Sequence, residues 1–190
     1  MVATALTQLP APFAQALASL RAAALGAGIE VREVPAPSRA AAFAVALSGS
    51  LARAGVPDDE VADGTFVVLY DPPLTPVDDG AFRVIVLVRA ELDEEMSGDP
   101  MLPEVAWDWM LEALEACPVA PVEPGGSVTR TITTSHGAVA GRPEEVELEL
   151  RASWSAVDPD VGAFLTAWAR VLRLFAGVPP VGVTSLDDRR

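Results

Sequence analysis

The sequence contains no lysine, and this absence excludes several kinds of chemistry. All 13 basic residues are arginine, so a phosphate-binding lysine of the Walker type, a Schiff-base lysine and a lysine general base are all ruled out. Histidine and cysteine each occur once, as His136 and Cys117, which is too few for a zinc site with the usual ligand count. No glycine-rich dinucleotide motif and no nucleophile elbow is present. We therefore expect no cofactor, no metal and no catalytic residue.

Cysteine and long apolar runs are also scarce. A single cysteine cannot form an intramolecular disulfide, which suits a reducing compartment. No apolar run reaches the roughly 18 residues that a membrane span requires. No basic residue precedes Arg21, so the N-terminal stretch is a poor signal peptide. These features predict a cytoplasmic protein without a membrane partner.

Positive charge is in short supply. The chain has 27 acidic and 13 basic residues, a net charge of -14. Nucleic acids and anionic membranes are bound by clustered cations, and the arginines here are scattered along the sequence. We therefore expect no nucleic-acid partner, whereas a basic protein partner is compatible with the acidity.

The predicted fold is an α+β domain spanning residues 1–190, with two layers: an antiparallel sheet of about six strands and three helices. A length of 190 residues with 51% hydrophobic residues fits one domain with an ample core. Residues 41–51 fit either a helix or a strand, and their alternation favours a strand that forms a hairpin with residues 29–34. The expected helices cover 12–25, 104–117 and 158–175, and the expected strands cover 29–34, 41–51, 65–70, 82–90, 127–134 and 144–154. Residues 53–63 are expected to be a polar connection, residues 118–126 a break, and Asp158 the N-cap of the last helix.

Two parts of the chain are similar to each other. When residues 64–118 are laid over residues 126–179, Gly64 falls on Gly126, and after one deletion Trp107 falls on Trp168. Each part reads as strand, turn, strand and helix. The alignment predicts an internal ββα duplication that follows an N-terminal helix and hairpin over 11–51; the alternative is convergent patterning of two ββα units.

The second strands of these two units differ on one face. The strand at 145–154 alternates apolar residues with Glu147 and Glu149, whereas Ile85 and Leu87 occupy the matching face of the strand at 82–90. Such an apolar second face needs cover, which the same chain, a partner subunit or a ligand could provide. We predict Ile85 and Leu87 as interface residues, together with Trp109, which lies off the apolar stripe of its helix.

The remaining candidate residues have ordinary structural explanations. Arg89 and Arg151 fall on matched positions and could bind an anion, although ion pairs with neighbouring acids are the expected alternative. Cys117, at a helix C-terminus, is expected to be structural, and His136 to lie in a solvated turn. The acidic clusters at 58–60, 78–79 and 93–95 are expected to be solvated charge runs.

Several longer motifs resemble a known family. The sequences Val88-Arg-Ala-Glu-Leu, Asp99-Pro-Met-Leu-Pro-Glu-Val-Ala-Trp-Asp-Trp, Leu111-Glu-Ala-Leu-Glu-Ala and Glu147-Leu-Glu-Leu-Arg-Ala-Ser-Trp resemble an actinobacterial family of uncharacterised proteins of about this length. The resemblance covers most of the chain and implies no activity. The order of elements is also similar to that of type III secretion chaperones, which are small, acidic, dimeric protein binders.

The sequence thus predicts an uncharacterised, non-enzymatic protein-binding or regulatory module that forms a homodimer. One alternative is a secretion-chaperone-like dimer. The other is a small-ligand protein or carboxylate-dependent enzyme, in which two acids, or Arg89 with Arg151, would converge on one cavity.

Overall fold

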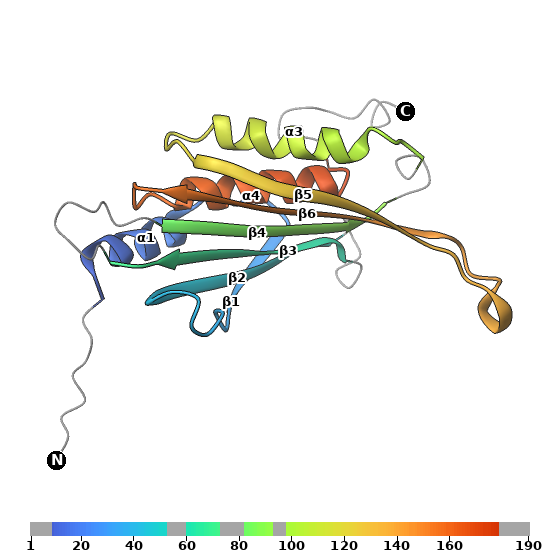
Figure 1. The fold of residues 1–190 in the computed structure, drawn as a ribbon, viewed down its shortest axis with the longest axis horizontal. Coiled ribbons are helices and arrows are strands. Elements are labelled where there is room, and N and C mark those ends of the chain that lie inside the picture. Colours follow the sequence, from blue (N-terminus) through green and yellow to red (C-terminus); the bar gives the residue numbers. More distant parts are fainter. Residues whose placement is uncertain (1–8, 53–59, 73–81, 93–97, 179–190) are drawn as a thin grey trace, which may run out of the picture.

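The computed structural model describes residues 9–52, 60–72, 82–92 and 98–178. They form one open sheet of six antiparallel strands, and the three α-helices lie on the same face of it (Figure 1). This arrangement confirms the predicted α+β class. The helices are α1 (Ala11–Ala22), α3 (Leu102–Glu115) and α4 (Gly162–Phe175), with a short 3-10 helix, η1 (Gly137–Val139). The strands are β1 (Ile29–Val34), β2 (Phe43–Ala52), β3 (Glu60–Tyr70), β4 (Phe82–Glu91), β5 (Val122–Thr133) and β6 (Glu145–Ala156).

The strand order is β1-β2-β3-β4-β6-β5. Neighbours in the sheet are consecutive in the chain except at the centre, where β4 pairs with β6 and Val88 lies opposite Leu150. The ambiguous segment 41–51 is confirmed as a strand. Its alanines favour a helix by propensity, but pairing with β1 on one side and β3 on the other outweighs that preference.

Two predicted boundaries were wrong. Residues 60–63, expected to be part of a polar connection, are the first residues of β3, because Asp63 lies on a sheet face without helices where a charge is tolerated. Strand β5 begins at Val122, inside the expected break, and its register shifts between Val122 and Gly125. A bulge on an edge strand accommodates Pro124, which cannot donate to a central ladder.

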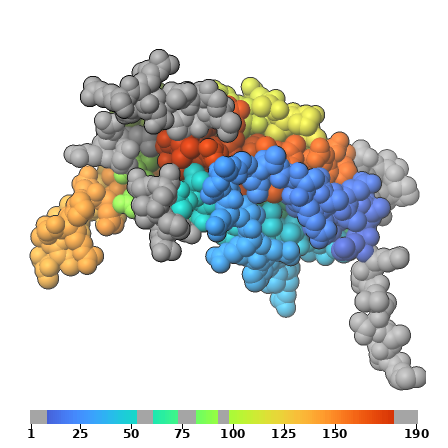
Figure 2. Space-filling view, turned by 180° about the vertical axis from the view of Figure 1, so that it is seen from behind, coloured from blue at the N-terminus to red at the C-terminus, as the bar shows by residue number. Residues whose placement is uncertain are grey.

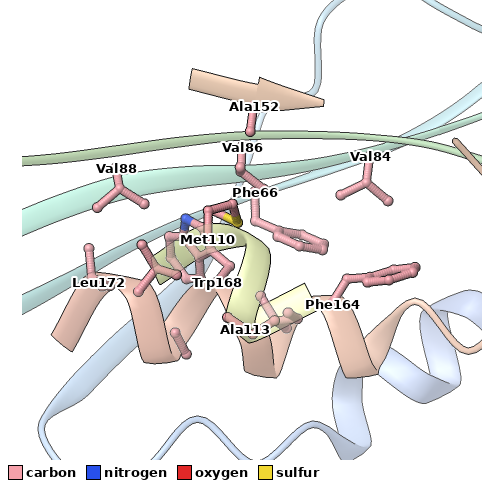
Figure 3. Close-up of a cluster of buried hydrophobic side chains, with 14 of the residues drawn as sticks. Phe66, Val84, Val86, Val88, Met110, Ala113, Ala152, Phe164, Trp168 and Leu172 are labelled. Carbon is pink, nitrogen blue, oxygen red and sulfur yellow. The ribbon is translucent and has the colours of Figure 1, made fainter. Parts of the chain in front are cut away.

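The hydrophobic core lies between the sheet and the helices (Figure 3). Trp168 and Phe164 of α4 are fully buried against strand residues such as Phe66, whose ring centroid is 6.1 Å from that of Trp168. Helix α4 buries more residues than the other two helices, in keeping with its position over the middle of the sheet.

The N-terminus of α4 is capped from a distant part of the chain. The predicted cap by Asp158 was wrong, since this carboxylate instead accepts a hydrogen bond from the backbone N–H of Asp160. The N–H of Gly162 donates to the Ser19 Oγ of α1 at 3.0 Å, and an added Cβ at Gly162 would collide with the backbone of Ser19. Helices α1 and α4 therefore approach closely at this glycine.

Two tryptophans pack over two strand glycines in similar ways. Trp168 of α4 lies over Gly64 of β3, and Trp107 of α3 lies over Gly126 of β5. An added Cβ at Gly64 would also meet the backbone oxygen of Leu87 on β4, and one at Gly126 would meet the corresponding oxygen on β6. Helix α4, in the second of the two similar parts of the chain, thus covers β3 of the first part. Helix α3, in the first part, covers β5 of the second. The internal duplication stays a prediction.

The β5–β6 hairpin extends beyond the body of the molecule (Figures 1 and 2). Its paired strands continue to Thr133 and Glu145, and η1 lies at the tip. His136 is exposed next to η1, in the hairpin connection where the sequence placed it.

Candidate functional site

The face of the sheet opposite the helices is the main candidate for a binding surface, and we call it the open face. None of the three described helices lies on it. Aliphatic side chains gather towards one end of the open face, next to the exposed Arg83, and a row of charged residues crosses the other end. The apolar side chains are Val34, Ala44, Ala46, Val67, Leu69, Ile85 and Leu87.

Ile85 and Leu87 lie side by side along β4 on the open face. Ile85 is 40% exposed as a whole residue, and Leu87 is half-buried. Ile85 has Val67 of β3 on one side and Ser153 of β6 on the other. The apolar patch therefore continues from β4 towards β3 and β2 and stops at β6, where serine and charged residues replace the aliphatics.

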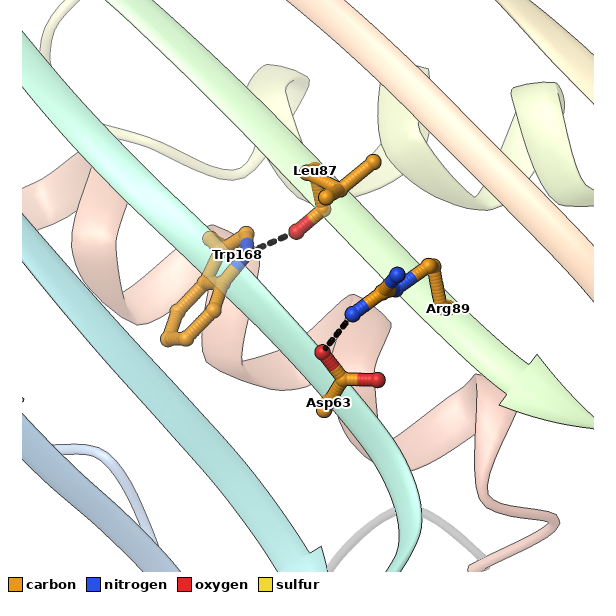
Figure 4. Close-up of polar contacts among 4 residues, drawn as sticks. All are labelled: Asp63, Leu87, Arg89 and Trp168. Carbon is orange, nitrogen blue, oxygen red and sulfur yellow. Dashed lines mark hydrogen bonds and ion pairs between the residues drawn. The ribbon is translucent and has the colours of Figure 1, made fainter.

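A row of charged residues crosses the open face beside this patch. The Nη2 of Arg89 donates to Asp63 Oδ2 at 2.7 Å (Figure 4), and Glu149 lies directly opposite Arg89 in the ladder. The hydrogen bond from Arg89 to Asp63, and then the charge of Asp63, raise the pKa of the guanidinium. The Nε of Arg151 donates to Glu149 Oε1 at 2.7 Å.

The two candidate arginines are therefore engaged in ion pairs. They lie symmetrically about the paired residues Val88 and Leu150, with Arg89 opposite Glu149 and Arg151 opposite Leu87. Both pairs are partly exposed to water, and surface pairs of this kind contribute about 0–1 kcal/mol each. Their main effect is to fix where each sign of charge lies on the open face.

A polar hollow of about 450 Å³ opens at the charged end of this face. Its charged lining residues are Glu30, Arg32, Asp63 and Arg89, so the two signs balance, and Ser48 contributes a hydroxyl. Arg151 is not part of this lining. The hollow combines residues from four strands, and sequence reasoning missed it because the strand register determines which of them meet.

The third predicted interface residue, Trp109, lies between two helices. Its ring makes an edge contact with Phe175 of α4 at 6.2 Å between centroids, and the side chain is half-buried. This position explains why a tryptophan off the main stripe of α3 is compatible with the fold. Its role in an interface stays a prediction.

Cys117 packs just beyond the end of α3. Its thiol donates to the carbonyl oxygens of Ala113 and Ala163, at 3.4 and 3.5 Å. Burial, and next the charge of Asp160, raise the pKa of the thiol. A raised pKa lowers the fraction of reactive thiolate.

We expect a neutral disulfide reagent at pH 7 to modify folded Cys117 at least about tenfold more slowly than the urea-unfolded chain, because thiolate and access are both limited. The rate is read from the released chromophore under pseudo-first-order conditions. Equal rates in the two states would contradict a structural role for this thiol.

The structure describes the predicted acidic clusters only in part. The acidic clusters at 58–60, 78–79 and 93–95 lie outside the described residues, apart from the backbone of Glu60. Within the described ranges, no group of three or more histidine, cysteine, aspartate or glutamate side chains could hold a metal ion. No helix in that part of the chain is both long and apolar enough to cross a membrane.

Comparison with known proteins gives a family without an assigned activity. A family model described as a protein of unknown function, DUF3000, matches residues 9–184. No curated protein matches the chain, and no solved structure matches it. The predicted membership of an uncharacterised family is confirmed, whereas the actinobacterial origin stays a prediction.

Proposed function

Because the chain belongs to the DUF3000 family, whose function is unknown, we propose a function from geometry: it is a non-enzymatic protein-binding module that self-associates through the open face. One observation carries this proposal. Ile85 and Leu87 lie on the side of the sheet away from the helices. The neighbouring strand β6 has Glu147 and Glu149 on the same side.

An apolar patch on an otherwise polar surface favours association, since contact with another apolar surface removes it from water. The patch around Ile85 is flanked on β3, β4 and β6 by mixed charges, with Asp63 and Glu149 set against Arg89 and Arg151. In a two-fold dimer the same surface meets itself and must be self-complementary. Alternating charges satisfy that condition, because an arginine of one copy can meet an acid of the other.

The remainder of the surface supports this choice of contact. The chain carries a net charge of -14, so two copies repel one another wherever acids face acids. The open face combines balanced charge with the exposed Ile85 and partly exposed aliphatic neighbours such as Leu87. It is therefore the surface on which the free energy of burial can exceed the repulsion.

We expect the wild-type protein at about 50 µM to sediment with a mass near twice 19.8 kDa, and Ile85→Lys to sediment as a monomer. Each copy would bury an unpaired ammonium group in the interface, which weakens association by about tenfold or more. Analytical ultracentrifugation over a concentration series measures the change.

The matched control is Ile132→Lys, because Ile132 is also exposed (49%) and lies on β5 rather than in the open face. This variant should sediment as the wild-type protein does. A wild-type protein that stays monomeric, or equal weakening by the two variants, would contradict self-association through the open face.

The polar hollow favours a second candidate, a small-ligand protein. Its balanced pairs of arginines and acids suit a small zwitterion better than a simple anion, since each charged group of the ligand would find an opposite partner. A screen of free amino acids by thermal shift tests this alternative, with Arg89→Met as the variant expected to remove any stabilisation. The chaperone-like alternative predicts the same dimeric mass in sedimentation as the leading proposal.

The proposal includes the broader expectations from the sequence. These are a single domain over residues 1–190, a regulatory role, a cytoplasmic location and the absence of a nucleic-acid partner. They follow from the length, the acidity and the single cysteine.

A further inference from the structure

The two edges of the sheet differ in how well they are protected from pairing with another strand. Edge strand β1 is six residues long, with Glu30, Arg32 and Glu33 among them. Edge strand β5 is twelve residues long, and after the bulge its sequence Gly-Ser-Val-Thr-Arg-Thr-Ile-Thr holds a single charge. Short, charged edges resist strand addition, whereas long edges rich in β-branched residues permit it. The outer edge of β5 is therefore a surface that can accept another strand.

A groove runs between this edge and helix α3. It has a volume of about 370 Å³, and its lining is mostly apolar. The helix contributes Pro103, Glu104, Trp107 and Asp108, and the strand contributes Gly126, Ser127 and Val128. The half-buried Trp107 ring lies directly over the backbone of Gly126. An edge strand beside a helix is the geometry in which extended peptides add to a sheet, with alternate side chains entering the groove.

Charge on the groove determines the kind of occupant. The exposed acids of α3 are Glu104, Asp108, Glu112 and Glu115, and no basic residue lies in its last turn. Such like charges at helical spacing destabilise a helix slightly and are not compensated within α3. The nearest cation on β5, Arg130, donates to the carbonyl oxygen of Asp99.

A second copy of the chain fits this edge poorly. Two-fold pairing of β5 with β5 would place the acidic surfaces of both α3 helices on the same side of a joined sheet. Since each chain also carries a net charge of -14, the approach is repulsive at close range. A basic segment meets the opposite condition and is attracted to the groove.

We propose that the groove between α3 and β5 binds an extended basic segment of a partner protein by β-strand addition. The segment pairs with the outer edge of β5 along residues 127–133. An apolar side chain of the segment lies on Trp107, and a neighbouring arginine or lysine lies against Glu104 and Asp108. Backbone hydrogen bonds supply affinity that depends little on sequence, and the groove supplies the preference for basic and apolar side chains.

The probe is a capped peptide of about eight residues that alternates arginine and valine, long enough to span the edge at about 3.3 Å per residue. We expect titration calorimetry to show binding in the micromolar range. The same peptide with glutamate in place of arginine should not bind. A third version carries N-methyl groups on alternate residues; it keeps the charge but cannot complete the ladder, and it should bind at least about tenfold more weakly.

Paired charge reversals on α3 test the groove itself. Glu104→Arg with Asp108→Arg should weaken binding of the arginine–valine peptide by about tenfold or more. Glu112→Arg with Glu115→Arg is the matched control, because it changes the net charge equally at exposed positions of the same helix that do not line the groove. Equal loss in both double variants, or equal binding by the N-methylated peptide, would show only non-specific charge attraction and overturn the proposal.

Hydrogen exchange determines whether the edge is the site. The outward-facing amides among residues 127–133 should exchange rapidly in the free protein and become protected when the peptide binds. Protection of these amides in the free protein would show that the chain itself or a second copy occupies the edge, which also overturns the proposal. The Ile85→Lys variant should bind the peptide as the wild-type protein does, so failure of this site is distinguishable from failure of the open-face proposal.

Discussion

Replacing Trp168 with alanine is expected to destabilise the folded protein by about 3–5 kcal/mol, within the range for large aromatic residues in a core. The side chain is fully buried between α4 and the sheet. Its ring lies over Gly49 and Gly64, which are paired with each other across β2 and β3. The two strand residues beneath the ring are glycines and have no side chain with which to fill the space.

A hydrogen bond adds to this packing. The Nε1 of Trp168 donates to the carbonyl oxygen of Leu87 at 3.0 Å (Figure 4). Alanine leaves that oxygen without this donor, which adds a desolvation cost of about 1–3 kcal/mol where water does not reach it. The loss is measured as the difference in unfolding free energy from urea titrations monitored by circular dichroism.

Two further variants separate the contribution of the Trp168 hydrogen bond from that of its packing. Trp168→Phe keeps most of the volume but removes the donor, so we expect an intermediate loss of about 1–3 kcal/mol. Trp107→Ala removes the other tryptophan that covers a strand glycine, but this residue is only half-buried and should cost less. A Trp168→Ala variant as stable as Trp107→Ala would mean that the ring over Gly49 and Gly64 is not a major source of stability.

Valine at position 64 is expected to destabilise the protein by about 2–3 kcal/mol, although valine favours strands and glycine does not. An added Cβ at Gly64 would collide with the backbone oxygen of Leu87 and press on the Trp168 ring. The backbone oxygen belongs to a central strand and cannot move away as a flexible side chain could. Steric overlap therefore outweighs the gain from β-propensity, which is at most about 1 kcal/mol.

Valine at the adjacent position, Thr65, is the control, because it should leave the unfolding free energy unchanged or raise it slightly. Thr65 lies on the open face of the same strand and is only partly buried, so Thr65→Val meets no helix and should change stability by no more than about 0.5 kcal/mol. Unfolding in urea again gives the comparison. If Gly64→Val matches Thr65→Val, the close approach of Trp168 and β4 to Gly64 does not constrain that position.

The parts of the fold that the sequence predicted are those that depend on local patterns. Strand β6 alternates strictly, and its apolar side chains from Val146 to Trp154 all lie in the core. The apolar stripe of α4 could be predicted from the sequence just as directly, because a single face of that helix packs against the sheet. Ile85 and Leu87 were assigned to the opposite face from alternation alone, and the register agrees.

The remaining features depend on contacts between distant residues. Two hydrogen bonds join elements that are far apart in the chain: the cap of α4 by Ser19 and the bond from Trp168 to Leu87. No local sequence pattern predicts either of them. The polar hollow requires the register of four strands at once. The groove beside β5 had a sequence signal, the nearly uncharged β-branched run after Gly126, but its meaning depends on β5 being an edge strand.

The contact between α1 and α4 limits the order in which the helices can fold during synthesis. Ser19 precedes its hydrogen-bond partner Gly162 by 143 residues and therefore leaves the ribosome well before it. Arg173 likewise donates to the carbonyl oxygen of Ala27, which lies 146 residues earlier in the chain. Hairpins such as β3–β4 can form while synthesis continues, but α1 cannot reach its final position until α4 has emerged. During translation, therefore, the apolar face of α1 stays without its packing partner until α4 has been synthesised. Nascent chains released before α4 is complete should not reach the native state.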